Sequence, residues 1–79
     1  MTCCLLYRPT PRSFRPRYYR VEIAMNLLEE VSVMREWGIS GGKGQSRIDI
    51  FGNLRQASEQ ADRLRNAAMK RGYSRTDAA

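Results

Sequence analysis

The segment from Trp37 to Gly44 holds the residues best suited to binding chemistry in this chain of 79 residues, because it joins the only tryptophan to a glycine-rich, cationic loop. The aromatic ring offers a stacking surface and Lys43 offers a positive charge. Strand-like runs flank the segment at Val31 to Glu36 and at Ser46 to Phe51, which predicts a hairpin whose loop displays both groups. Such a loop suits an anionic partner that can stack on an aromatic ring.

The same residues also have a purely structural interpretation. The Trp37 ring can cap a small core and satisfy its indole N–H locally. The positive φ angles of a turn account for the loop glycines Gly41, Gly42 and Gly44 without any ligand. In the binding interpretation, the hairpin supplies phosphate contacts from three cations, Arg35, Lys43 and Arg47. The residues alone leave both interpretations open.

Several enzyme classes are excluded by composition. The chain has no histidine, and its two cysteines, Cys3 and Cys4, are adjacent near the N-terminus. A Ser-His or Cys-His nucleophile is therefore absent, and a zinc site lacks its four ligands. The glycine loop is not a Walker A motif, because Trp37 stands where the first glycine is required and Gly44 follows Lys43. We expect no enzyme activity, no catalytic residues, no metal and no cofactor.

Length and charge favour a binding module. A chain of this size buries only about 60% of its unfolded surface, which leaves little room for an enclosed active site. The formal net charge is +6, which favours a polyanion as partner, either nucleic acid or an anionic membrane surface. The first twenty residues hold five cations and no acid, at Arg8, Arg12, Arg15, Arg17 and Arg20.

The N-terminal cations lie in a segment that also contains Pro9, Pro11 and Pro16, which disfavour helix and sheet. We therefore expect residues 1–17 to form a flexible basic arm, which serves either as a nucleic-acid contact or as a solvated tail without function. The adjacent cysteines suggest no disulfide framework, and residues 3–7 are too short for a signal peptide or a membrane span. These features predict a cytoplasmic protein that does not enter membranes.

Periodicity predicts an α+β fold. Tyr18 to Met25 alternates apolar and polar residues, as do the two runs that flank the loop, which predicts a small antiparallel sheet of three strands, or of four with a further strand. After it, Asn53 and Gln56 can form a capping box, and Gly72 can end the helix in a left-handed cap. We expect this C-terminal helix to cover one face of the sheet over Val21, Ile23, Val33, Ile48 or Ile50. The domain is expected at residues 18–73, followed by a flexible tail at 74–79.

The order of motifs resembles the WGR domain family. The resemblance runs from Tyr18-Tyr19 through Arg35-Glu36-Trp37-Gly38 to Gly72-Tyr73, and its most specific part is the run Trp-Gly-x-x-Gly-x-x-Gly-Gln that ends at Gln45. Members occur beside the catalytic region of poly(ADP-ribose) polymerases and as small stand-alone bacterial proteins. The resemblance implies an antiparallel sheet with one helix packed on it, and a chain of the bacterial stand-alone kind.

The resemblance also implies a role. In the polymerases that sense DNA breaks, the family tryptophan packs on a nucleotide at a strand end and neighbouring basic residues hold phosphates, which corresponds to Trp37 and Arg35 here. One position departs from the pattern, because Ile39 stands where the family has the arginine of Trp-Gly-Arg. Lys43 or Arg47 can replace that charge, whereas an exposed Ile39 can instead mark a protein contact.

Two functions follow as hypotheses. The first is a non-enzymatic nucleic-acid-binding module for DNA ends, nicks or single strands, with DNA preferred to RNA. Its expected contact residues are Trp37, Arg35, Gly38, Lys43, Gln45, Arg47, Arg17 and Arg20. The alternative is a protein-interaction or regulatory module with an apolar patch at Trp37 and Ile39, extended by Met34. The sequence does not fix the oligomeric state, although an exposed edge strand permits a dimer.

Overall fold

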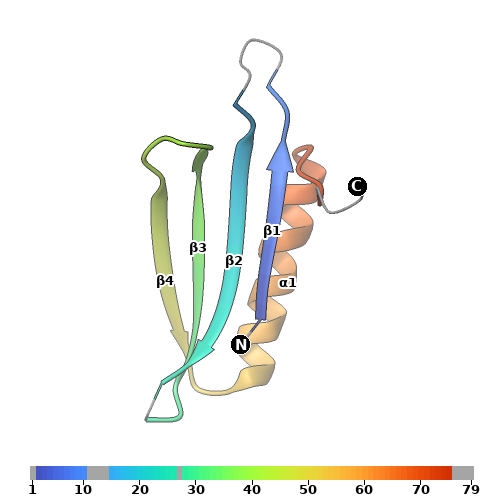
Figure 1. The fold of residues 1–79 in the computed structure, drawn as a ribbon. Coiled ribbons are helices and arrows are strands. Elements are labelled where there is room, and N and C mark those ends of the chain that lie inside the picture. The colour runs from blue at the N-terminus through green and yellow to red at the C-terminus, as the bar shows by residue number, and fades with distance from the viewer. Residues whose placement is uncertain (1, 11–14, 27, 76–79) are drawn as a thin grey trace.

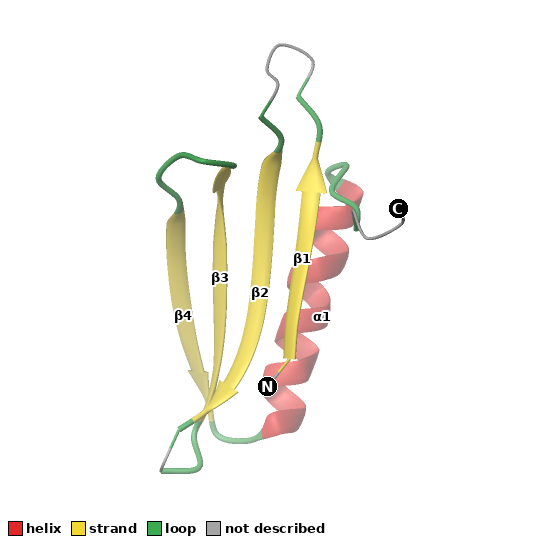
Figure 2. Cartoon of the chain, in the orientation of Figure 1, coloured by secondary structure: helices red, strands yellow, loops and turns green. Residues whose placement is uncertain are grey.

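The computed structural model describes residues 2–10, 15–26 and 28–75 and shows a four-stranded antiparallel sheet with one helix on one face (Figures 1 and 2). The strands are β1 (Thr2–Arg8), β2 (Arg17–Met25), β3 (Val31–Ile39) and β4 (Gln45–Phe51), and the helix is α1 (Leu54–Lys70). Strand order in the sheet follows chain order. The predicted α+β class is confirmed, in its four-stranded form.

The N-terminal segment forms strand β1, where the sequence analysis expected a flexible arm. Residues 2–8 pair with β2 along their whole length, with Leu6 opposite Tyr19, and the Leu6 side chain is only 1% exposed. Cys4 and Leu6 alternate with the outward Cys3 and Leu5, which is a strand pattern. The flexible arm predicted for residues 1–17 is therefore wrong for residues 2–8. The prolines do not prevent the pairing, because Pro9 follows the last paired residue. Residues 11–14 lie outside the described part of the chain.

The first residue of the predicted C-terminal tail, Ser74, is not flexible but is bonded to the sheet. Ser74 exchanges two backbone hydrogen bonds with Tyr7, each 2.8 Å long, so this residue is fixed on the outer side of β1. Figure 1 shows the C-terminal end of α1 beside the C-terminal end of β1. Residues 76–79 of the predicted tail lie outside the described residues.

The core lies between the sheet and α1. The alternation predicted in β2 is confirmed, because Tyr19, Val21 and Ile23 are buried. They pack with Val31 and Val33 of β3, with Leu6 of β1, and with three residues of α1, Ala57, Leu64 and Ala68. The small alanines let the helix lie close to the sheet.

The prediction that Ile48 or Ile50 lies under α1 is wrong. In the register between β3 and β4, Asp49 is opposite the buried Val33, so the odd-numbered residues of β4 face the helix. Ile48 and Ile50 consequently face the other side of the sheet and are 58% and 56% exposed. Period-two alternation fixes which residues share a face, but only the pairing decides which face meets the helix.

Both ends of α1 form as local signals predict. The Asn53 side chain accepts a hydrogen bond of 2.9 Å from the Gln56 N–H, which confirms the Asn53 half of the capping box. At the other end Gly72 has a φ of +99°, the Gly72 N–H bonds to the Met69 carbonyl, and the Tyr73 N–H bonds to the Ala68 carbonyl. This is a Schellman motif. It turns the chain back so that Tyr73 packs against the sheet.

Candidate nucleic-acid interface

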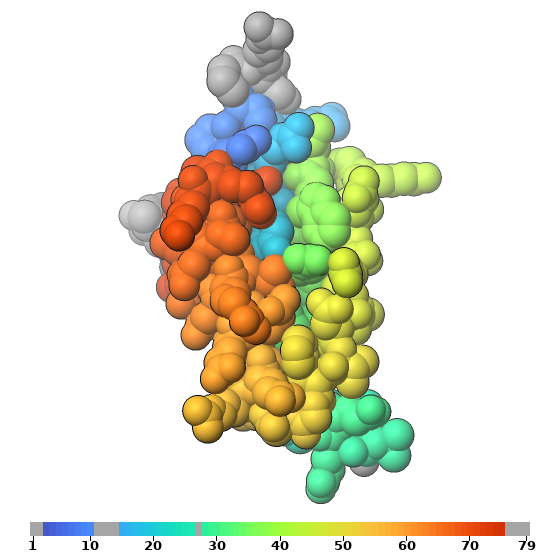
Figure 3. Space-filling model, turned by 180° about the vertical axis from the view of Figure 1, so that it is seen from behind, coloured from blue at the N-terminus to red at the C-terminus, as the bar shows by residue number. Residues whose placement is uncertain are grey.

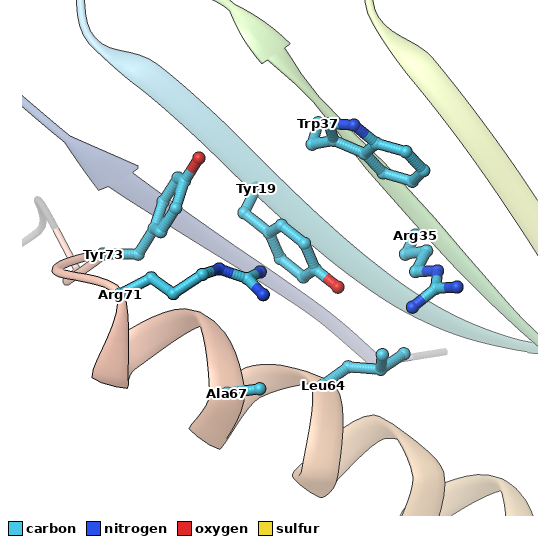
Figure 4. Close-up of a pocket in the computed structure, with 7 residues that line it drawn as sticks. All are labelled: Tyr19, Arg35, Trp37, Leu64, Ala67, Arg71 and Tyr73. Atoms are coloured by element: carbon cyan, nitrogen blue, oxygen red, sulfur yellow. The ribbon is translucent and has the colours of Figure 1, made fainter.

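A pocket of about 450 Å³ opens between the C-terminal part of α1 and strands β2 and β3. Figure 3, viewed from the helix side, shows a hollow between α1 and the β3–β4 hairpin with β2 at its floor. Three aromatic side chains, two arginines and two aliphatic helix residues line it, as Figure 4 shows: Tyr19, Trp37, Tyr73, Arg35, Arg71, Leu64 and Ala67. Its volume is within the range of small-molecule binding sites.

The aromatic residues form the walls of the pocket. Tyr19 and Trp37 are opposite each other on neighbouring strands, and Tyr73 meets Tyr19 edge to face with ring centroids 5.8 Å apart. Tyr19 and Tyr73 are buried, whereas Trp37 is half-buried and packs against the edge of the core. Part of the Trp37 ring therefore supports the fold, and part stays open to the pocket.

The structure places Trp37 in strand β3, where the sequence analysis expected a loop residue. The hairpin continues to the pair Trp37 and Gln45, so the loop contains only residues 40–44. Gly38 and Gly44 make this close approach possible, since a Cβ on Gly44 would collide with the Tyr18 hydroxyl. Of the loop glycines, only Gly41 has a positive φ, at +83°.

Two guanidinium groups lie over the aromatic rings of the pocket. The Arg35 Cζ is 5.8 Å from the Trp37 ring centroid, and the Arg71 Cζ is 5.7 Å from that of Tyr19. Arg8 adds a third such contact from β1, with its Cζ 5.3 Å from the centre of the Tyr73 ring. These arrangements make the pocket both aromatic and cationic, which is the combination that an anion with a flat ring requires.

Arg35 is held in an unfavourable electrostatic position. It is directly opposite Arg47 in the β3–β4 ladder, on the face that meets α1, and like charges at such positions repel. Arg47 has an ion pair with Asp49 at 3.5 Å. The Arg35 Nε is buried and has no hydrogen-bond partner among the described residues. A negative charge placed in the pocket beside the guanidinium would offset the repulsion between Arg35 and Arg47.

Five of the predicted contact residues share this face of the sheet, Arg17 of β2 among them. Trp37 and Arg35 of β3 are opposite Gln45 and Arg47 of β4, and the register brings all four to the side of α1. Arg17 begins β2 and is the partner of Ile39 in the ladder. Lys43 is exposed in the loop. Gly38 contributes no side chain and instead packs on Gly44.

Arg20, in contrast, lies on the opposite face of the sheet and does not line the pocket. It forms an ion pair of 2.6 Å with Glu22 and a longer one of 3.9 Å with Glu36. Glu36 also accepts a hydrogen bond of 2.8 Å from the Tyr18 hydroxyl, which raises the pKa of Tyr18 above its ordinary value. The charge of Arg20 is thus compensated within the fold.

The apolar patch predicted at Trp37, Ile39 and Met34 does not form a single surface. Trp37 and Ile39 are on the face of the sheet that meets α1, whereas Met34 is on the opposite face.

Five pocket residues were not among the predicted contacts, and three of these, Tyr19, Arg71 and Tyr73, have aromatic or cationic side chains. Their sequence signals were structural, since Tyr19 belongs to the buried face of a strand and Arg71 to the cationic last turn of a helix. The Schellman motif at Gly72 turns the chain back and brings Tyr73 to the pocket. The alternation of Tyr19 with Val21 and the pair Arg71 and Tyr73 around a C-cap glycine are the signals that could have identified them.

Cations gather at the end of the molecule where the pocket opens. The end of β1, the start of β2, the β3–β4 loop and the end of α1 meet there, at the top of Figure 1. The cations at this end, taken from the described residues, are Arg8, Arg15, Arg17, Lys43, Lys70, Arg71 and Arg75. The turn between β2 and β3 at the opposite end carries Glu29 and Glu30. Positive charge is therefore concentrated at the pocket end of the strands, and two acidic residues lie at the other end.

Within the described ranges, no group of three or more His, Cys, Asp or Glu residues is placed to hold a metal ion. The helix of the described chain is too short and too polar to cross a membrane.

A small antiparallel sheet, one helix across its face, and an aromatic, arginine-lined pocket between them define a small α+β binding module. The family model of the WGR domain matches residues 3–79, and the chain belongs to this family. WGR domains are a family of nucleic-acid-binding modules. The match includes β1, which the sequence analysis had placed outside the domain.

A curated relative is an uncharacterized protein of Sinorhizobium fredii named y4dW. It is 35% identical over 66 residues, which cover 84% of this chain and 32% of the relative. The chain thus spans about a third of the length of that protein.

Proposed function

We propose that this chain is a non-enzymatic nucleic-acid-binding module that recognises DNA ends, nicks or single strands through the pocket beside Trp37. The observation that carries the proposal is the state of Arg35. Its buried Nε has no hydrogen-bond partner among the described residues, it opposes Arg47, and it lies over the Trp37 ring. A nucleotide phosphate beside this guanidinium would balance the charge of the two arginines, and the base or sugar would pack on the Trp37 ring.

The position of Trp37 supports a preference for accessible nucleotides. Its ring is half-buried between the sheet and the pocket, so a partner must enter the hollow to reach it. Bases inside an intact duplex are covered by their neighbours, whereas terminal, nicked and single-stranded nucleotides can leave the stack. Stacking of one base on an aromatic side chain contributes about 1–3 kcal/mol.

Phosphates on either side of that nucleotide would meet the basic end of the molecule. Arg71 borders the pocket, and Lys43 and Arg17 lie farther along the same end. Arg17 is opposite Ile39, which holds the position of the missing family arginine, so Arg17 can supply a cation close to that place. Such contacts fix position but not sequence, and non-specific affinity of about 10⁻⁴ to 10⁻⁶ M is expected at physiological salt.

The test is fluorescence anisotropy with labelled nicked, blunt-ended and single-stranded DNA at two salt concentrations. The informative variant is Trp37→Leu, which keeps an apolar side chain against the core but removes the stacking ring. Arg55→Gln is the matched surface control, because Arg55 is exposed on α1 at the end far from the pocket. We expect Trp37→Leu to weaken binding about 5- to 150-fold, as loss of one stacked base implies, and Arg55→Gln to change it little.

The proposal is contradicted if Trp37→Leu and Arg55→Gln bind all three DNAs as the wild type does. A protein-interaction module would behave differently from a nucleic-acid module with respect to salt. An apolar interface persists at about 0.5 M salt, whereas phosphate binding falls with a log-log slope set by the number of contacts. A salt-resistant protein partner together with no DNA binding at low salt would support the alternative.

A further inference from the structure

The outer edge of strand β4 is open, and its side chains are arranged to match a second copy of themselves. The sheet has two edges, β1 and β4. The edge of β1 is partly closed, because Ser74 bonds to Tyr7 in both directions. No hydrogen bond from the described residues closes the outer edge of β4, which Figure 1 shows at one side of the sheet. An open edge strand is a template for pairing with another chain.

Two apolar residues of β4 lie on the uncovered face of the sheet beside this open edge, where a paired strand would bring neighbours next to them. Ile48 and Ile50 are 58% and 56% exposed on the face of the sheet that α1 leaves uncovered, next to the half-buried Met34. Outward charges at an edge strand ordinarily discourage association, but the two on this strand, Arg47 and Asp49, have opposite signs. This strand has a cation before Ile48 and an anion after it. Two such strands in antiparallel order can therefore be complementary to each other.

We propose that this chain forms a symmetric dimer in which β4 pairs antiparallel with β4 of a second copy, with the two-fold axis at Ile48. In this register Arg47 is opposite Asp49 of the second copy, and Asp49 is opposite Arg47 of the second copy. Ile48 meets its own equivalent on the other face, and Ser46 meets Ile50. Two opposite-charge pairs and one isoleucine pair therefore form at once, each of the kind that stabilises neighbouring strands.

The neighbouring registers are opposed by the same charges. An axis at residue 47 would place the two Arg47 side chains opposite each other, and an axis at residue 49 would do the same with the two Asp49 side chains. Like charges directly opposite are destabilising. The charge pattern thus selects the Ile48 register from those adjacent to it.

The dimer has a consequence for the geometry of the whole molecule. A two-fold axis perpendicular to the sheet makes one sheet of eight strands, with both helices on the same face. Both pockets would then open on one side of the dimer. The interface is one strand of seven residues, about 24 Å long, so a reversible dimer that depends on concentration is expected.

Sedimentation equilibrium of the full chain, without nucleic acid, tests the dimer independently of the proposed function. The mass is expected to rise from 9.1 kDa towards twice that value as the concentration increases. Arg47→Asp and Asp49→Arg each place like charges opposite each other in two pairs, and each is expected to weaken dimerisation about 10-fold or more. Arg55→Asp makes the same change of charge on α1 and should dimerise as the wild type does.

Mixing the two variants provides the decisive measurement. A dimer of one Arg47→Asp chain with one Asp49→Arg chain again has opposite charges in both pairs. The mixture should therefore dimerise within about threefold of the wild type, although neither variant does so alone. A wild type that stays at 9.1 kDa at all concentrations, single variants that dimerise unchanged, or a mixture without recovery would each overturn the proposal.

Discussion

Replacing Arg35 by methionine is expected to stabilise the fold and to weaken nucleic-acid binding at the same time. A functional residue held at a cost to stability behaves in this way, whereas a structural residue does not. Methionine keeps an unbranched apolar stem of similar length, so the packing against α1 and Trp37 is largely retained. The guanidinium is the part that is lost.

The magnitude follows from the contacts of Arg35. The buried Nε without a partner costs about 1–3 kcal/mol, and the opposition to Arg47 costs about 0.2–1 kcal/mol. The contact of the guanidinium with the Trp37 ring contributes about 0.5–1 kcal/mol in the other direction. The net expectation is a gain of about 0.2–3.5 kcal/mol, centred near 2 kcal/mol. At about 4–8 °C per kcal/mol for a domain of this size, the central value corresponds to a rise in Tm of about 8–16 °C.

The effect on binding has the opposite sign. A hydrogen bond to a charged group contributes about 1.5–3 kcal/mol, so Arg35→Met should weaken DNA binding about 10- to 150-fold. The slope of log K against log salt should become less steep by about 0.7–0.9 units, which is the contribution of one phosphate contact. Thermal unfolding by circular dichroism and a salt series of anisotropy titrations measure the two quantities. A Tm that falls by several degrees, or an unchanged affinity, would refute the assignment of Arg35 as a ligand-binding residue.

The remaining predictions concern the scaffold of the site. Leu6→Ala is expected to destabilise the fold by about 2–5 kcal/mol, because Leu6 is 1% exposed, whereas the neighbouring Leu5, at 42% exposed, should tolerate alanine with a change of about 0.5 kcal/mol or less. Equal effects in urea unfolding would contradict the assignment of β1 to the core. Gly44→Ala is expected to cost about 1–3 kcal/mol, because its Cβ would displace the Tyr18 hydroxyl from Glu36. Tyr18→Phe should then cost less in the Gly44→Ala background than alone, which a double-mutant cycle of unfolding free energies measures.

Local signals predicted the parts of the fold that local contacts decide. The alternation from Tyr18 to Met25 is repeated in the burial of β2, and Asn53 and Gly72 cap α1 as their residue types indicate. In each case the interactions join residues close together in the chain. A sequence contains this information directly.

The errors arose where distant residues decide the outcome. Proline content suggested a free arm, but the pairing of Leu6 with Tyr19 depends on a partner thirteen residues away. The face of Ile48 depends on its register with Met34. Trp37 lies in a strand because Gly38 and Gly44 permit the hairpin to continue past Glu36.

The candidate site was predicted in part for the same reason. Trp37, Arg35, Gln45 and Arg47 share one face because strand neighbours two residues apart always do so. The pocket itself needs Arg71 and Tyr73, which reach it only after α1 has crossed the sheet and the chain has turned at Gly72. No spacing in the sequence shows that approach.

The most direct test of the central claim uses Trp37 itself, which is the only tryptophan of the chain. Its intrinsic fluorescence reports contact between the ring and a nucleotide without any label, and it can be followed during titration with nicked or single-stranded DNA. The account predicts a saturable change of emission whose midpoint matches the anisotropy titration and shifts to weaker binding at high salt. DNA binding that leaves the emission of Trp37 unchanged would contradict it.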